Sequence, residues 1–258
     1  MTGKLRSTIR RNGPALALTA GLLILWETVC VTGLVPAYML PSPTDILRAF
    51  VRDFPELCGH AAVTLQEAAY GLILGVALGF VFAVGMDAFD WLSRALYPIL
   101  VITQTIPTVA IAPLLVLWFG YEMAPKIILI VLVTFFPMAV GMMEGFRSVD
   151  PDSVALLRSM GASRQQIFRY IKCPAALPQF FSGLRIAAAY SVVGAVISEW
   201  LGGFQGLGVY MTRVRKAYAF DKMFAVIFLI SAISLLLMAL VDILQKKCMP
   251  YTHTPEEE

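Results

Sequence analysis

Long apolar stretches, almost free of charge, alternate with short polar segments along this chain. Six such stretches follow one another, at residues 14–39, 61–86, 95–121, 127–143, 173–198 and 223–241. A helix needs about 20 consecutive, mainly apolar residues to cross a bilayer core of about 30 Å. Five stretches are long enough, and the fourth extends at both ends. The pattern therefore predicts an all-α integral membrane protein with about six transmembrane helices.

The composition supports this prediction and excludes several classes of function. Hydrophobic residues make up 59% and charged residues 14% of the 258 residues, against roughly 45–50% and about 25% in soluble domains. The net charge of +3 is too small to indicate nucleic-acid binding. The four cysteines have no CxxC spacing and the two histidines are isolated, so we expect no metal site and no histidine-based catalysis. Cys30 and Cys58 are expected to be free thiols, with a disulfide as the alternative.

The distribution of basic residues predicts the orientation in the membrane. The first apolar stretch follows a basic segment but is longer than the core of a signal peptide, and no small-residue cleavage site follows it. We therefore expect a retained first span. Basic residues on the side that holds both termini outnumber those on the other side by thirteen to seven. The positive-inside rule then predicts cytoplasmic tails at residues 1–13 and 248–258, around a membrane domain at residues 14–247.

Prolines and glycines modify the predicted spans. Pro98, Pro107 and Pro113 lie in the third stretch, and this predicts a bent or broken helix, which either lines a pathway or is only kinked. Gln104 and Thr105, beside Pro107, are candidate polar groups of such a pathway.

Other glycines and turn residues indicate local structure. Gly71, Gly75 and Gly79 recur every fourth residue in the second stretch, a spacing that favours close helix packing in lipid. After the first stretch, Thr44 is expected to cap a short amphipathic helix at residues 45–54, which Pro55 ends.

Glu199 lies at the end of the fifth stretch, next to the glycine-rich segment 201–208. An acidic residue in or near a span is a functional candidate because its burial in lipid is costly. Glu199 could therefore belong to an outer gate of the pathway, and a structural acid at a helix end is an equal alternative.

A polar insert at residues 150–174 separates the fourth and fifth stretches. Asp150 and Pro151 suit the cap and first position of a helix, and Gly161 suits its end. Ser163 with Gln166 forms a capping box for a second helix, which Pro174 is expected to end. The insert thus predicts a helix, a glycine turn and a helix on the cytoplasmic face, where it either binds a partner or forms a solvated loop.

In this insert, Gly161-Ala162-Ser163-Arg164 is followed by Ile171-Lys172-Cys173-Pro174, with nine residues between Gly161 and Ile171. This spacing resembles the cytoplasmic EAA loop of permease subunits in bacterial ABC importers. The resemblance covers about residues 26–245 and is closest to the branch for nitrate, sulfonates, taurine and thiamine-precursor pyrimidines. It also includes Leu40-Pro41-Ser42-Pro43, Ile106-Pro107, Ala112-Pro113-Leu114, Trp118-Phe119-Gly120 and Arg147-Ser148-Val149-Asp150-Pro151.

The chain departs from the family pattern in two respects. Ala155, Leu156 and Leu157 occupy the Glu-Ala-Ala positions, and Cys173 replaces the usual leucine before the proline. The absence of the glutamate removes one polar contact with the partner, so we expect the contact there to be more apolar than is usual in the family.

The resemblance implies a complex of several subunits in the bacterial cytoplasmic membrane. Two copies of the chain would form the channel, two ATPase subunits would bind ATP and Mg²⁺ on the cytoplasmic side, and a substrate-binding protein would dock outside. The chain itself has no GxxxxGK[ST] loop, so we expect a permease subunit that is not an enzyme. The substrate is expected to be a thiamine-precursor pyrimidine; aliphatic sulfonates, taurine or nitrate are alternatives, and a passive channel is an alternative of another class.

The resemblance also assigns candidate residues. Those expected to couple the permease to the ATPase are Arg158, Ser159, Met160, Gly161, Ala162, Ser163, Arg164 and Pro174. Pro107 and Glu199 join Gln104 and Thr105 as candidates for the translocation pathway. Arg213, Arg215 and Lys216 are expected on the outer side, where they would pair with acidic residues of the binding protein, with lipid or with solvent.

Overall fold

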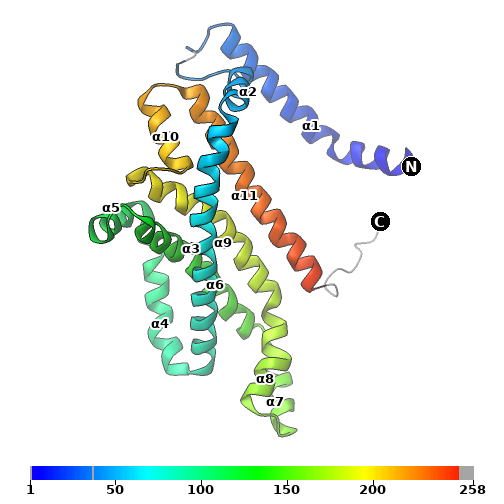
Figure 1. Cartoon of the computed structure of the whole chain (residues 1–258). Coiled ribbons are helices and arrows are strands. Elements are labelled where there is room, and N and C mark those ends of the chain that lie inside the picture. The colour runs from blue at the N-terminus through cyan, green and yellow to red at the C-terminus, as the bar shows by residue number, and fades with distance from the viewer. Residues whose placement is uncertain (1, 37, 250–258) are drawn as a thin grey trace. The chain divides into compact units, whose positions relative to one another are not determined.

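The computed structural model describes residues 2–36 and 38–249, and their secondary structure is entirely helical (Figure 1). The chain divides into two compact units, one made of residues 1–58 and 210–229, the other of residues 59–209 and 230–258. Residues 250–258 of the expected C-terminal tail lie outside the described residues.

The first unit contains α1 (Thr2–Val31), α2 (Pro43–Arg52), most of α10 (Leu207–Lys216) and the beginning of α11 (Phe220–Cys248). The N-terminal segment expected as a tail is thus part of α1. The Glu27 carboxylate accepts a hydrogen bond from the Thr44 hydroxyl at 2.7 Å, which joins α1 to α2.

The prediction for α2 was wrong at both ends. Its N-cap is Ser42 and not Thr44, because Pro43 takes the first helical position and the Ser42 hydroxyl accepts from the Asp45 N–H at 3.2 Å. The helix ends at Arg52, and a new helix begins at Phe54, so that Pro55 lies in a first turn, where its missing N–H leaves no bond unmade.

The second unit holds most of the apolar helices. They are α3 (Phe54–Ala88), α4 (Asp90–Thr103), α5 (Thr108–Phe119), α6 (Met123–Arg147), α7 (Pro151–Ser159), α8 (Arg164–Ile167), the π-helix η1 (Phe168–Lys172), α9 (Cys173–Leu201) and the rest of α11.

Glycine positions bring α3 and α6 into close contact. A Cβ atom at Gly71 would clash with Ile130, one at Gly75 with Thr134, and one at Gly79 with Met138. The predicted packing role of this four-residue spacing is therefore confirmed.

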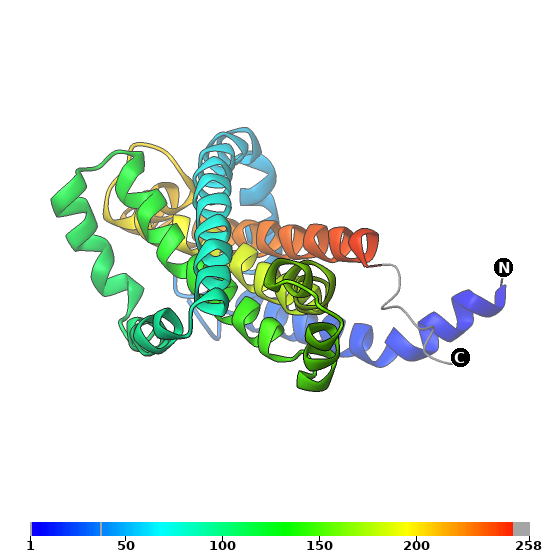
Figure 2. The same ribbon diagram turned by 90° about the horizontal axis from the view of Figure 1, so that it is seen from below.

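Five described helices are long and apolar enough to cross a membrane, and α4 with α5 makes a sixth span if the bent pair counts as one. The two helices of this pair meet at 98°, and Figure 2 shows α5 running across the axis of α4, which is seen end-on. The all-α membrane fold is confirmed. The predicted break in the third stretch is confirmed as well, since Pro107 stands directly before α5.

Candidate functional site

The polar insert forms the predicted helix, glycine turn and helix. The Asp150 carboxylate accepts hydrogen bonds from the N–H groups of Asp152 and Ser153 at 3.1 and 3.2 Å, and these bonds lower its pKa below the ordinary value. Gly161 has a φ of +85°, the left-handed conformation in which a side chain is strained. Both bonds of the Ser163–Gln166 capping box are present.

Pro174 does not end the second helix, and this prediction was wrong. The helix continues from α8 through η1 into α9, as one span of 38 residues from Arg164 to Leu201. In η1 the backbone hydrogen bonds join residues five apart instead of four, so that the Cys173 N–H donates to the Phe168 carbonyl. Because the ladder changes register here, Pro174 is accommodated in the first turn of α9.

The base of this long helix is fastened to its neighbours. The Lys172 ammonium donates to the Asp87 carboxylate of α3 at 2.6 Å. The Phe168 ring lies 5.3 Å from that of Phe146 in α6 and packs against the buried cluster around Met142. These contacts join the insert to α3 and α6.

The predicted coupling residues form the exposed tip of the insert. All from Arg158 to Arg164 are exposed except Ala162, which is partly buried, and Pro174 is exposed further along. Met160 is 73% exposed and Leu156 62%. Apolar side chains thus stand at the tip and at one of the positions that hold Glu-Ala-Ala in the family pattern.

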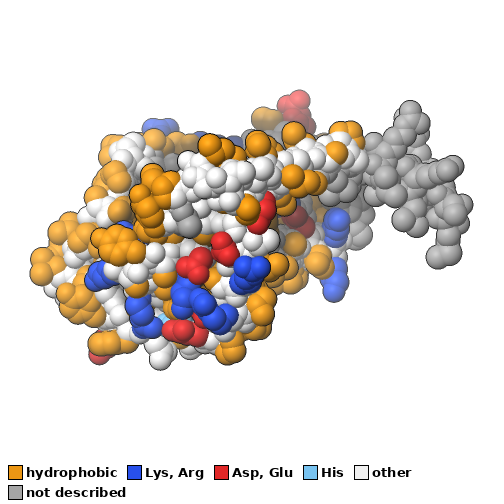
Figure 3. All heavy atoms as spheres, turned by 90° about the horizontal axis from the view of Figure 1, so that it is seen from above, with side chains coloured by type: hydrophobic (Ala, Val, Ile, Leu, Met, Phe, Trp, Pro, Cys, Tyr) orange, Lys and Arg blue, Asp and Glu red, His pale blue; other side chains and the backbone are white. Residues whose placement is uncertain are grey.

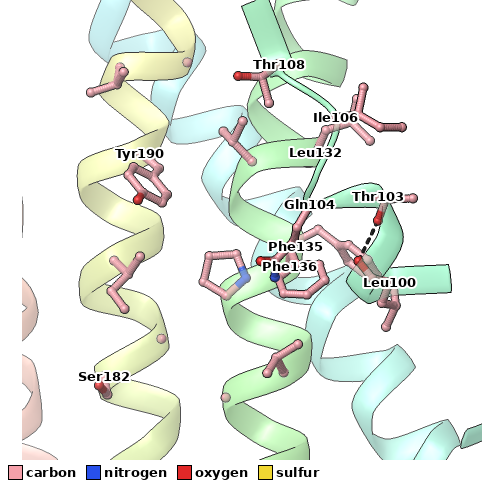
Figure 4. Close-up of a pocket in the computed structure, with 18 of the residues that line it drawn as sticks. Leu100, Thr103, Gln104, Ile106, Thr108, Leu132, Phe135, Phe136, Ser182 and Tyr190 are labelled. Atoms are coloured by element: carbon pink, nitrogen blue, oxygen red, sulfur yellow. Dashed lines mark hydrogen bonds between the residues drawn. The ribbon is translucent and has the colours of Figure 1, made fainter. Parts of the chain in front are cut away.

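A cavity of about 820 Å³ lies higher up, between α9, α6 and the break between α4 and α5 (Figure 4). Gln104 lines this cavity, whereas Thr105 and Pro107 belong to the break but not to the lining. Figure 4 shows Tyr190 and Ser182 on one helix, across from Gln104 and Phe136. The polar residues of α9 in the lining are Gln179, Ser182 and Tyr190, spaced three and eight residues apart on a single face.

Glu199 does not line the cavity and is buried in a polar cluster at the other end of α9. Its carboxylate accepts from the Thr64 hydroxyl at 2.7 Å and from the Gly208 N–H at 2.6 Å. In the same cluster the Lys126 ammonium donates to the Glu67 carboxylate at 2.6 Å. Glu67 and Lys126 are both buried, and both interact electrostatically with Glu199.

Thr64, Glu67 and Lys126 are members of this cluster that were not predicted from the sequence. Glu67 carried a signal, since it is the sole charge in the second apolar stretch. Nothing in the sequence shows that Lys126, at the start of α6, reaches it across 59 positions.

The basic residues of α10 belong to the other unit. Arg213 is paired with Glu56 at 3.2 Å, whereas Arg215 and Lys216 are exposed and make no ion pair among the described residues. Nearby, Lys222 pairs with Asp53 at 2.7 Å. Figure 3 shows basic and acidic side chains interleaved on the face seen from above.

All four cysteines are free, so Cys30 and Cys58 are not joined in the structure.

The sequence model of the family described as "Binding-protein-dependent transport system inner membrane component" matches residues 75–249. The chain belongs to this family. A "Probable ABC transporter permease protein" from Haemophilus influenzae is 39% identical over 88% of this chain and 93% of its own length. The "Formylaminopyrimidine transport permease protein ThiX" from Halalkalibacterium halodurans is 36% identical over 89% of this chain and 92% of its own.

A relative named for another substrate and a solved structure are also similar to this chain. The "Putative aliphatic sulfonates transport permease protein SsuC" from Bacillus subtilis is 30% identical over 93% of this chain and 88% of its own length. The crystal structure of an amino acid ABC transporter with histidines superposes with a TM-score of 0.64 at 16% identity, over 77% of this chain and 96% of that one, and supports the fold of the permease. The resemblance to ABC importer permeases that the insert indicates is thereby confirmed.

Proposed function

We propose that this permease subunit forms half of the channel of an ATP-driven importer and that α9 carries motion from the ATPase to the pathway. One observation supports this above all: a single continuous helix, residues 164–201, has the exposed insert at its base, the cavity lining along its middle and Glu199 at its far end. At 1.5 Å per residue its 38 residues extend about 57 Å.

We infer the partners of the subunit from the same proposed function. ATP and Mg²⁺ would bind to ATPase subunits that contact the exposed tip around Met160 and Ala162. A second copy of the permease would close the open side of the cavity, and an extracytoplasmic binding protein would dock on the side of Arg213, Arg215 and Lys216. Both termini would then be cytoplasmic, in the inner membrane of a bacterium.

We propose a thiamine-precursor pyrimidine as the substrate, because a formylaminopyrimidine permease is among the most similar relatives. Aliphatic sulfonates, taurine or nitrate are the second candidate class, favoured by the similarity to the sulfonate permease.

Cross-linking tests the coupling directly. In a variant without native cysteines, Ala162→Cys should form a cross-link to the ATPase subunit whose yield changes with ATP and Mg²⁺. Asp90→Cys, at the exposed start of α4, is the matched control and should not cross-link. The absence of any ATP-sensitive link from position 162 would refute the proposed docking.

A passive channel is distinguished by transport. Proteoliposomes with the whole complex should accumulate substrate only with ATP inside and binding protein outside. Equal uptake without ATP would show a channel instead.

A further inference from the structure

The charge of the cavity lining indicates the chemistry of the compound that crosses it. None of the described residues that line the cavity is lysine or arginine, and Glu144 is the sole charged residue among them. Glu144 is exposed and makes no ion pair with any described residue. The lining therefore presents one uncompensated negative charge and no positive one.

An anion would be poorly stabilised in this environment. Moving an anion from water into an apolar site is costly unless a positive group or several hydrogen-bond donors compensate it. Here a sulfonate or nitrate would also be repelled by Glu144. A second copy of the chain would present the same residues, because a two-fold interface pairs identical surfaces, and would add a second carboxylate.

The polar groups of the lining suit a neutral ring with N–H donors. The side-chain oxygen of Gln179 is buried and has no hydrogen-bond partner among the described residues. An unpaired buried acceptor is destabilising until it meets a donor, and an amino group of a ligand would supply one. The amide of Gln104 and the hydroxyls of Ser182 and Tyr190 add further groups on the same surface.

Aromatic residues complete this surface. Phe135, Phe136 and Tyr190 line the cavity, and Phe135 is held edge-on against Phe82 with ring centroids 5.3 Å apart. Flat rings stack on such side chains by offset or edge-to-face contact.

We propose that the cavity binds a flat, uncharged nitrogen heterocycle bearing amino groups, that Gln179 is its specificity-determining acceptor, and that Glu144 excludes anions. This inference rests on the proposed function, since it assumes that the cavity is part of the pathway. It decides between the two substrate classes that the relatives leave open.

Binding to the purified permease–ATPase complex, without binding protein, tests the inference apart from transport. The probes are radiolabelled 4-amino-5-hydroxymethyl-2-methylpyrimidine and ethanesulfonate, in equilibrium dialysis. We expect saturable binding of the aminopyrimidine that ethanesulfonate does not displace. Tighter binding of ethanesulfonate, or binding of neither probe, would overturn the inference.

Variants assign the roles of the two residues. Gln179→Leu should weaken aminopyrimidine binding about five-fold to ten-fold. Tyr190→Phe should weaken this binding by less, because it keeps the aromatic ring at an exposed position. Glu144→Arg should admit ethanesulfonate, whereas Glu122→Gln, at the exposed start of α6, should leave both probes unchanged. Wild-type selectivity in Glu144→Arg would contradict the role of Glu144.

Transport separates this inference from the proposed function. ATP-dependent uptake of ethanesulfonate but not of the aminopyrimidine would uphold the importer and refute the proposed substrate class. ATP-independent uptake of the aminopyrimidine, together with its saturable binding, would refute the importer and uphold the chemistry of the cavity.

Discussion

The Thr64 hydroxyl donates to the Glu199 carboxylate at 2.7 Å, across 135 positions of the chain. The same two side chains hold the start of α10, because the Leu207 N–H donates to the Thr64 oxygen at 2.8 Å and the Gly208 N–H to Glu199 at 2.6 Å. Glycine is required at position 208, since a Cβ there would lie 2.9 Å from that of Glu199. The far end of α9 is thus joined by hydrogen bonds to α3 and to the start of α10.

Removing the Thr64 hydroxyl should weaken this connection between α9, α3 and α10. Thr64→Val keeps the shape of the side chain but leaves the Leu207 N–H and one Glu199 oxygen without their partner. We expect a loss of about 1–3 kcal/mol of stability, seen as a lower thermal unfolding midpoint of the purified complex. Thr19→Val, at an exposed position of α1, should not lower it. An unchanged midpoint in Thr64→Val would show that the Thr64 hydrogen bonds contribute nothing to stability.

Removing one member of the buried Lys126–Glu67 ion pair should strongly destabilise the protein. Lys126→Met leaves the Glu67 carboxylate buried without its cation, and we expect a loss of about 3–5 kcal/mol. The double variant Lys126→Met/Glu67→Gln should recover most of this loss, because no unpaired charge remains. Thermal unfolding of the two single variants and the double variant measures the coupling. If the stability losses of the two single variants were additive in the double variant, direct pairing of Lys126 with Glu67 would be contradicted.

The left-handed turn of the insert should be required for coupling. Gly161→Val places a β-branched residue at a φ of +85°, a conformation that costs roughly 1–2 kcal/mol. We expect the reconstituted complex to hydrolyse ATP while its uptake falls at least several-fold. Gly161→Asn should retain more uptake, because asparagine tolerates this conformation. Wild-type uptake per ATP in Gly161→Val would contradict the role of the turn.

The cap of α7 should depend on pH. The pKa of Asp150 is lowered in the fold by the N–H bonds it accepts, so its contribution to stability is present above the ordinary aspartate value of about 3.9 and is lost as the pH falls through the lowered folded value. Amide hydrogen exchange of residues 151–159, corrected for intrinsic rates, should show protection falling over this range. Asp150→Asn keeps a capping side chain and should remove that dependence; the same pH profile in both proteins would exclude Asp150 as its cause.

Features encoded by local sequence were predictable. The spans follow from apolar length, the break before α5 from Pro107, and the insert from its caps and Gly161, because each depends on residues close together in the chain. The continuation through Pro174 was not predictable in this way, since it passes through a π-helix whose Phe168 and Lys172 contact α6 and α3, which are distant in the sequence. The cavity and the Glu67–Lys126 pair arise from tertiary packing, which periodicity does not reveal.

In the proposed mechanism, the continuous helix of residues 164–201, which includes α9, transmits motion from the insert to the cavity as one rigid element. Double electron–electron resonance on the reconstituted complex tests it, with spin labels at Ala162→Cys or Ser182→Cys in both copies of a variant without native cysteines. Addition of ATP and Mg²⁺ should shift the copy-to-copy distances at both positions. A shift at position 162 with none at position 182 would contradict transmission along α9.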